Sequence, residues 1–368
     1  MQLTEADAAG NGTATEGAPT KRRVRCLNPF WWMDIGDHGA VTPCCNSWFH
    51  GEITHVRDGV SVMDAWNGKE FQEVREAMYE GGNWEKFCNS KTCPQILNDK
   101  WIDIDNDVMP IPLEAQADIR AGRTEMSRGP AQIGLTNDPR CQLRCIMCTS
   151  AINPNRDGRS MKEVLADIET ALPHVHRMRM LASGEVFVVP ELRDFLFNFD
   201  TQKYPDMKFT ILSNGMMLNA GLWDKIKHLN IDYLIISIDA ATKETYEKIR
   251  LRGKWDVLFE NLKFLAQKEK EGAIGNVQIN MCVMKSNCHE LVKFAQMGLD
   301  LGVSLTYFTT ILGEFPNEQI FDPPQTESLL SVKQQLLDPI MQNPKVDAST
   351  LNQWLNWNPP TLLERMLA

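Results

Sequence analysis

The feature that most constrains the fold is an alternation of strand-like and helix-like segments between residues 129 and 312. Short apolar runs of strand length are separated by amphipathic stretches with helical periodicity. This pattern is typical of parallel β/α units, because a parallel strand needs a long crossover before the next one. The predicted strands are 132–136, 178–182, 208–212, 233–238, 277–283 and 304–308, and the predicted helices are 161–172, 191–199, 220–229, 243–268 and 288–301.

Three cysteines with CxxxCxxC spacing, Cys141, Cys145 and Cys148, follow the first predicted strand. A cubane iron–sulfur cluster takes one thiolate per iron, so three local cysteines leave its fourth iron open. In β/α barrels the working residues lie at the C-terminal ends of strands, which is where these cysteines fall. A structural zinc site or a group of buried thiols is the alternative interpretation of this spacing.

The cysteine triplet resembles the signature of the radical SAM superfamily, in which the open iron chelates S-adenosylmethionine (SAM). The resemblance implies an α/β fold with a partial (β/α)6 TIM-like barrel over residues 129–312. It also implies that a reduced [4Fe–4S] cluster gives one electron to SAM. Methionine and a 5′-deoxyadenosyl radical result, and the radical abstracts hydrogen from a substrate. The cofactors carry the difficult chemistry, and an electron donor such as flavodoxin or ferredoxin is expected.

Later segments at strand ends fit the same resemblance. Ser183-Gly184-Glu185 resembles the family's Gly-Gly-Glu-Pro segment, with Ser for the first Gly and Val for the Pro. A carboxylate there would suit the methionyl ammonium of SAM. In relatives the serine that ends the fourth strand is often paired with an arginine, here Arg250 or Arg252. The residues that the resemblance implies for SAM binding are Met147, Ser183, Gly184, Glu185, Ser213, Asn214, Ser237 and Arg250.

Cys282 lies on the fifth predicted strand, where alternation places Asn280, Cys282 and Met284 on one face. If that face lines the barrel, the thiol could return a hydrogen atom to a substrate radical, as epimerases require. The alternative is that Cys282 is a small buried hydrophobic residue, a common role for free cysteine.

Residues 25–98 predict a small cysteine-rich α+β domain. A hairpin around Gly36–Gly39 would bring Cys26 and Cys44 together, and a helix is expected over 69–79. The segment resembles the auxiliary-cluster domains called SPASM and twitch, although here it precedes the barrel. The resemblance implies a second [4Fe–4S] cluster on Cys26, Cys44, Cys88 and Cys93, with Cys45 as a substitute for Cys44. A zinc site with four cysteine ligands is the alternative.

The remaining segments predict a disordered tail (1–24), a linker with a short helix over 113–121 (99–128), and a helical C-terminal extension (313–368). The extension has an expected helix over 328–341 that either caps the barrel or packs on a partner.

The composition and charge of the chain indicate which classes of partner to expect. The 368-residue chain carries a net charge of −10 and no basic stripe, which argues against nucleic-acid binding. It has no apolar run of membrane-spanning length and no signal peptide, so we expect no membrane and a cytoplasmic location. Ten cysteines in such a chain favour metal ligation over disulfides.

The substrate is a small molecule or a peptide. No separate leader-peptide-binding domain is evident, so we favour oxidation or epimerisation of a carbohydrate or natural product. One alternative is a radical SAM maturase of a peptide or protein. A different class is a non-catalytic iron–sulfur or zinc protein for electron transfer or binding.

Overall fold

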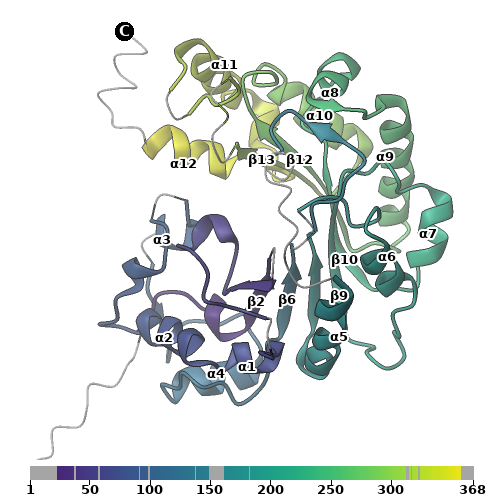
Figure 1. Ribbon diagram of the computed structural model, residues 1–368. Coiled ribbons are helices and arrows are strands. Elements are labelled where there is room, and N and C mark those ends of the chain that lie inside the picture. Colours follow the sequence, from purple (N-terminus) through teal and green to yellow (C-terminus); the bar gives the residue numbers. More distant parts are fainter. Residues whose placement is uncertain are drawn as a thin grey trace, which may run out of the picture.

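The computed structural model describes residues 23–357 except 37–38, 57–58, 91, 98–99, 137, 149–160, 182, 312–314, 316 and 322–323. Its main feature is one ten-stranded sheet in the order β14-β13-β12-β10-β9-β8-β6-β2-β3-β4 (Figure 1). The strands from β14 to β2 pair in parallel, and β2, β3 and β4 pair antiparallel. The predicted α/β fold class, with a partial TIM-like barrel, is confirmed.

All six predicted strands form, with ends that move by at most two residues. They are β6 (Gln132–Leu135), β8 (Arg177–Met180), β9 (Lys208–Ser213), β10 (Ile231–Ser237), β12 (Asn276–Val283) and β13 (Leu305–Thr310). The intervening helices are α5 (Met161–Ala171), α6 (Pro190–Phe197), α7 (Ala220–Ile226), α8 (Lys243–Ile249), α9 (Trp255–Lys270) and α10 (Leu291–Leu301).

The prediction of one helix over 243–268 is wrong. Strand β11 (Arg250–Leu251) separates α8 from α9 and pairs antiparallel with β7 (Arg144–Cys145). Arg252 turns the chain with a φ of 71°. A Cβ at Gly253 would lie 2.7 Å from the Arg250 carbonyl oxygen, so a side chain there would not fit this turn. The helix is interrupted because its backbone groups pair with the cysteine loop instead.

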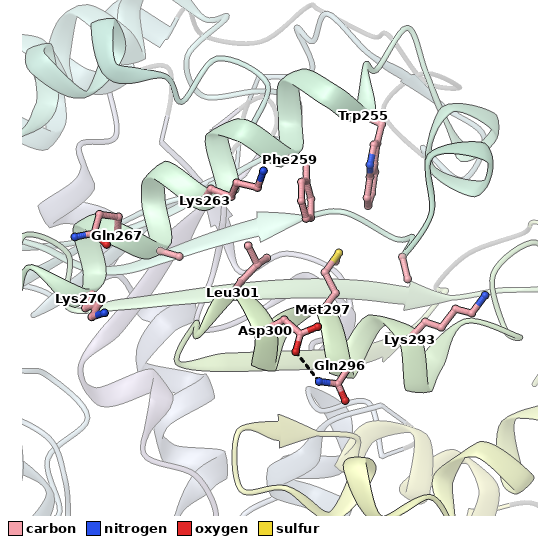
Figure 2. Close-up of a pocket in the computed structure, with 12 residues that line it drawn as sticks. Trp255, Phe259, Lys263, Gln267, Lys270, Lys293, Gln296, Met297, Asp300 and Leu301 are labelled. Atoms are coloured by element: carbon pink, nitrogen blue, oxygen red, sulfur yellow. Dashed lines mark hydrogen bonds between the residues drawn. The ribbon is translucent and has the colours of Figure 1, made fainter.

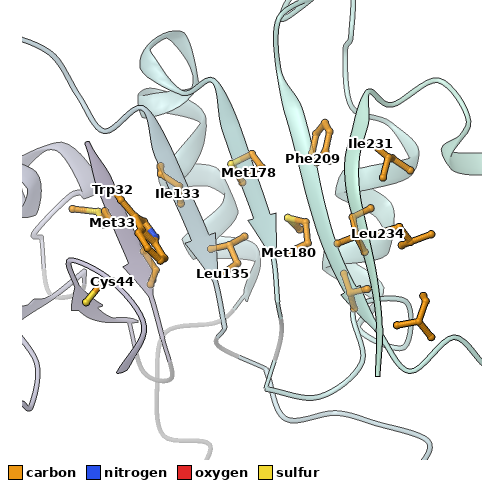
Figure 3. Packing of buried hydrophobic residues seen from close by; sticks show 14 of the residues in the cluster. Trp32, Met33, Cys44, Ile133, Leu135, Met178, Met180, Phe209, Ile231 and Leu234 are labelled. Atoms are coloured by element: carbon orange, nitrogen blue, oxygen red, sulfur yellow. The ribbon is translucent and has the colours of Figure 1, made fainter. Parts of the chain in front are cut away.

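The two faces of the sheet differ in polarity. One face is apolar and buried, and Figure 3 shows Ile133, Met178, Phe209 and Ile231 lined up across it. Helix α10 packs on this side, because a Cβ at Gly298 would touch Thr306 and Ile279. On β8, β12 and β13 the residues of the opposite face are half-buried. We call that opposite face the inner face. On five of its strands it carries Arg179, Thr210, Ser237, Asn280, Cys282 and Tyr307.

The cysteine-rich segment is joined to the barrel through the sheet. β2 (Trp32–Ile35) pairs in parallel with β6, and the hairpin continues with β3 (Ala40–Thr42) and β4 (Thr54–His55). Its helices are α1 (Val62–Trp66), α2 (Lys69–Met78) and α3 (Pro94–Leu97). In Figure 1 these purple and blue elements form one lobe beside β6. The expected hairpin and helix are therefore present, and the hairpin extends the barrel sheet.

Residues predicted as a linker pack tightly on this lobe. They carry β5 (Ile102–Asp103) and α4 (Leu113–Arg120). β5 pairs with β1 (Arg23–Val24), so the predicted disordered tail ends earlier than expected, and residues 1–22 lie outside the described part. The buried Arg75 guanidinium donates to the carbonyl oxygens of Pro29, Trp66 and Thr124. These bonds attach residue 124 to the lobe because a buried guanidinium needs acceptors.

The C-terminal segment packs against the last barrel strand. It contains α11 (Thr326–Leu336), β14 (Val346–Asp347) and α12 (Ser349–Trp357). β14 extends the sheet beside β13, and the Tyr307 hydroxyl lies 2.8 Å from the Thr350 hydroxyl of α12. Of the alternatives for this extension, packing on the barrel is observed. Within the described ranges, no helix has the length and apolarity needed to cross a bilayer.

Candidate active site

The cysteine triplet lies in the loop after β6, held in place by its pairing with β11. Cys145 is in register with Arg250, and the Ile146 amide donates to the Ile249 carbonyl oxygen at 3.0 Å. The Cys148 amide donates to the Cys145 carbonyl oxygen at 3.2 Å, which turns the chain back on itself. All three thiols are half-buried. A segment more than 100 residues away thus shapes the cysteine loop.

The electrostatics of these thiols fit a bound metal cluster. Burial raises the pKa of the Cys145 thiol to about 11, against the opposing effect of Arg250, whose Nη1 lies 3.8 Å from Cys145 Sγ. Burial also raises the pKa of Cys141, and Cys148 raises it further. Thiolates so close together need positive charge, which a cluster supplies. Among the described residues, no three Cys, His, Asp or Glu side chains are spaced for a single ion, so the fit rests on the donor set.

A carboxylate joins the ends of β8 and β9. Glu185 is 1% exposed, and its oxygens accept hydrogen bonds from the Ser213 hydroxyl at 2.8 Å and the Asn214 amide at 2.7 Å. Burial raises the pKa of Glu185, while these two bonds lower it. The Asn214 side chain in turn reaches the cysteine loop, with its Nδ2 3.7 Å from Cys141 Sγ. Three of the predicted SAM-binding residues therefore form one hydrogen-bonded group with Cys141.

Gly184 lets this group approach the cysteine loop. A Cβ at Gly184 would lie 2.2 Å from the Arg140 carbonyl oxygen, which accepts a hydrogen bond from the Glu185 amide at 2.9 Å. Only a residue without a side chain permits such close backbone contact.

A second group connects the other side of the loop to β10 and β12. Arg250 donates through Nε and Nη2 to Asp239 Oδ2, at 2.9 and 2.6 Å. Asp239 Oδ1 accepts from the Cys282 amide at 2.8 Å. Asp239 therefore connects Arg250 of β11 to the backbone of β12. Asp239 has a φ of 64°, unusual for a residue other than glycine.

The other predicted site residues lie nearby without direct bonds to the cysteines. Met147 is half-buried in the cysteine loop, and the Ser183 hydroxyl donates to the Thr136 carbonyl oxygen. Ser237 and Cys282 are half-buried on the inner face, with Ser237 in register with Asn280. Gln142 was missed. Its side-chain amide exchanges two hydrogen bonds with that of Asn214, at 3.1 and 3.3 Å. Its place between two cysteines was the available signal.

The four N-terminal cysteines gather in the lobe beside β6. Cys26, Cys44 and Cys93 are buried, and Cys88 is half-buried. Burial, with smaller contributions from Cys93 and Cys88, raises the pKa of Cys26 to about 12. Burial also raises the pKa of Cys44, followed by the effects of Cys26, Cys93 and Cys88, with Cys45 the weakest neighbour. The four thiols thus lie within electrostatic range of one another, as ligands of a common cluster would.

A prominent cavity lies elsewhere. It is a groove of about 660 Å³ between α9 and α10, where Figure 2 shows Trp255, Phe259 and Met297 flanked by Lys263 and Lys293. Both helices belong to the outer layer of the barrel, so this groove is not where the cysteines and the inner face meet.

The comparisons with known proteins agree with this site. Residues 139–297 match the model of the Radical SAM superfamily. They form a radical SAM domain, and the enzymes of that superfamily use a [4Fe–4S] cluster and SAM. The non-catalytic alternative is therefore set aside.

Individual relatives are distant. The chain is 23% identical over 159 residues to a probable GTP 3′,8-cyclase from Methanococcus maripaludis, covering 43% of this chain and 51% of that protein. It is 24% identical over 173 residues to the mycofactocin maturase MftC of Mycobacterium tuberculosis, covering 45% and 41%. The chain thus spans about half the length of the curated relatives it matches. A structure of Streptococcus suis SuiB bound to S-adenosylmethionine aligns with a TM-score of 0.47 at 14% identity, covering 66% of this chain and 56% of that one.

Proposed function

We propose that Cys141, Cys145 and Cys148 hold the [4Fe–4S] cluster and that this enzyme acts on a substrate bound against the inner face. When bound, the reduced cluster supplies the electron that splits SAM into methionine and the 5′-deoxyadenosyl radical, which takes a hydrogen atom from the substrate. The observation that carries the proposal is the pair of hydrogen-bonded groups. One connects Cys141 to Glu185 through Asn214, and the other connects Cys145 to Asp239 through Arg250.

The residues of this chain have distinct tasks in the proposal. Arg250 provides positive charge beside Cys145, and Asp239 fixes the guanidinium from the other side. Glu185 keeps Ser213 and the Asn214 amide in position at the end of β9. SAM is then contacted by the remaining predicted residues. These are Met147, Ser183, Gly184 and Ser237, together with the polar groups of Ser213 and Asn214 that do not bind Glu185. The electron donor is a small redox protein such as flavodoxin or ferredoxin.

A cysteine variant tests the reaction. In Cys145→Ala, reductive SAM cleavage should fall at least a hundredfold, because one of three cluster ligands is missing. Chromatography and mass spectrometry of 5′-deoxyadenosine measure it in anaerobically reconstituted protein. Cys288→Ala is the matched control, since Cys288 is a buried thiol outside the triplet. If Cys145→Ala still cleaved SAM at the wild-type rate, the cluster assignment would be wrong.

We further propose that the four thiols Cys26, Cys44, Cys88 and Cys93 hold a second [4Fe–4S] cluster. Their mutual electrostatic interactions support a common site, and Cys44 rather than Cys45 is the ligand because it is buried beside Cys26. Burial raises the pKa of Cys26, Cys88 and Cys93, and the positive charge of Arg25 opposes this rise in all three.

For the outcome of the reaction we propose oxidation or epimerisation of a polar small molecule. The inner face supports a polar substrate, because Ser237, Asn280 and Cys282 meet there. Cys282 is the proposed hydrogen donor, and its amide is held by Asp239. If epimerisation is the reaction, Cys282→Ala should consume SAM but leave the substrate radical without hydrogen return. Deuterium incorporation at the product carbon in D₂O should then fall to background. Unchanged incorporation would exclude the thiol.

Peptide maturation is the second candidate, favoured by the resemblance to the mycofactocin maturase MftC. A co-purified or genomically neighbouring peptide that gains a mass change in the presence of SAM would support it over the first candidate.

A further inference from the structure

The groove between α9 and α10 has no part in the SAM chemistry described above. Its volume is about 660 Å³, and Figure 2 shows Trp255 and Phe259 of α9 on the side that faces Met297 and Leu301 of α10. The rings of Trp255 and Phe259 are stacked, with their centroids 5.5 Å apart and their planes inclined by 17°. The groove is therefore a preformed apolar surface, and an open apolar surface is typical of a contact site for another molecule.

The rim of the groove is positively charged, although the chain as a whole carries a net charge of −10. Lys263, Lys270 and Lys293 line it, and Asp300 is the one acidic residue among the described residues of its lining. Lys263 Nζ lies 2.8 Å from Glu260 Oε1, but both side chains are more than half exposed, so water weakens this pair. Within the described ranges, Lys270 and Lys293 have no ion pair.

The positive charge continues from the groove toward the cysteine loop. Arg252 and Lys254 precede α9 and are exposed, and so is Arg144 on β7, the strand that pairs with β11. In the part of the chain that the structure describes, none of these three cations has an ion pair. Beside them, the Leu251 side chain is 45% exposed. We call the groove and these four residues the basic face.

The basic face contacts the residues that hold Cys145 in place. The Trp255 ring packs on the buried Tyr246 ring, with centroids 5.7 Å apart. Tyr246 lies one helical turn before Arg250, which is in register with Cys145. Burial raises the pKa of Tyr246, Arg250 opposes the rise and Cys145 adds to it, so the phenol lies within electrostatic range of the thiol. A molecule bound on the basic face would therefore lie beside the cysteine loop, outside the inner face.

We propose that the basic face is the docking surface of an acidic protein that carries one electron. The positive rim complements a negatively charged partner and steers its approach. An apolar centre inside a polar rim is typical of protein interfaces, and redox complexes use small ones, so a groove with its flanks is large enough. The closeness to Cys145 favours a redox partner over other acidic proteins, because electron transfer slows steeply with distance.

The proposed step moves one electron and neither makes nor breaks a bond at the interface. The reduced carrier loses the electron and is oxidised, and the cluster on the cysteine triplet gains it. The redox identity of the partner thus rests on the proposed function, whereas the charge and the apolar centre of the basic face do not.

Charge reversal tests the docking surface in the full-length, reconstituted protein. Surface plasmon resonance, with oxidised flavodoxin and oxidised ferredoxin as probes, should show that the wild type binds at least one of them. That binding should weaken at least tenfold at about 1 M salt, where charges are screened beyond ~3 Å. At low salt, Lys263→Glu combined with Lys293→Glu should weaken it at least tenfold. The matched control, Lys69→Glu with Lys227→Glu, reverses two exposed lysines outside the basic face and should bind as wild type.

Two reductants separate this proposal from the proposed function. Dithionite is a small chemical reductant that needs no docking surface, so the variant with Lys263→Glu and Lys293→Glu should form 5′-deoxyadenosine at the wild-type rate with it. With the reduced carrier protein the same variant should be at least tenfold slower. Wild-type protein that cleaves no SAM with dithionite would contradict the proposed function, while weaker carrier binding by the variant would still support the docking surface.

Three results would overturn the docking proposal. The first is wild-type protein that binds neither carrier. The second is wild-type carrier affinity in the variant with Lys263→Glu and Lys293→Glu, with circular dichroism showing that it is folded. The third is binding of the wild type to phosphatidylserine vesicles but to neither carrier, which would indicate a membrane surface as the partner instead.

Discussion

Among single residues, Asp239 has the most demanding position in the site. Its side chain accepts two hydrogen bonds from Arg250 and one from the Cys282 amide, and its backbone has a positive φ. The side chains of Asp239 and Arg250 are 2% and 9% exposed, so solvent hardly screens their charges. The pair therefore stabilises the position of β11, to which the cysteine loop is attached.

Asp239→Asn should destabilise the protein by about 3–5 kcal/mol, because it leaves the Arg250 charge buried without a counter-charge. Urea unfolding of the reconstituted protein measures the change. The matched control is Asp256→Asn, which removes an exposed carboxylate paired with Lys243 and should leave the midpoint unchanged. A similar small effect in both variants would contradict the role given to Asp239.

The residues of the site differ in how visible they were in the sequence. The three cysteines were visible through their spacing, and Glu185 through its motif and strand-end position. The sequence does not show that Ser213 and Asn214 are hydrogen-bond partners of Glu185, because the motif that contains them indicates only SAM binding. An internal hydrogen bond across 28 residues depends on strand order, and no local pattern contains it.

Among the secondary-structure elements, the short pairing of β7 with β11 decides the geometry of the cysteine loop. Each of these strands has only two residues, so further contacts must hold the pairing in place. The Arg250–Asp239 pair holds β11, and the close contact of Gly184 with Arg140 holds the start of the cysteine loop. Helical periodicity through residues 243–268 hid this strand. The amphipathic pattern continues across the break, so periodicity alone predicts an unbroken helix.

Gly184→Ala should displace the segment before α6 from the cysteine loop. Its Cβ would lie 2.2 Å from the Arg140 carbonyl oxygen, and such overpacking costs about 1–3 kcal/mol. We expect a lower unfolding midpoint and at least a twofold loss of 5′-deoxyadenosine formation. Gly36→Ala is the control, since its Cβ would make only an ordinary contact at 3.5 Å with Asn46. Equal behaviour of the two variants would argue against a required close approach.

In the molecule as a whole, the cysteine-rich lobe and the barrel share one sheet. β2 follows Cys26 and pairs with β6, and β6 leads directly into the cysteine triplet. A rigid sheet of this kind fixes the distance between the two groups of cysteines. It also places Trp32 and Asp34 of the lobe on the inner face of the barrel, so the lobe contributes to the substrate side.

Two cysteine groups imply two separate clusters in the whole chain. Anaerobically reconstituted protein should contain about eight irons per chain, as two cubanes require. Cys26→Ala together with Cys93→Ala should lower the content to about four, while the SAM-binding triplet keeps its cluster. Iron analysis with Mössbauer spectroscopy distinguishes the outcomes. About four irons in the wild-type protein would remove the second cluster, and zinc in its place would support the alternative of a zinc site.

The sequence by itself determined the β/α alternation, the cysteine spacing and the hairpin at Gly36–Gly39, because periodicity, spacing and turn preference act between near neighbours. Only the tertiary structure decided the pairing of β2 with β6, the break at Arg250 and the position of the Asp34 carboxyl over Gly134. Each depends on the pairing of strands that lie about 100 residues apart in the sequence. The CxxxCxxC motif thus indicates the chemistry, while the lobe that precedes it extends the barrel sheet by three strands.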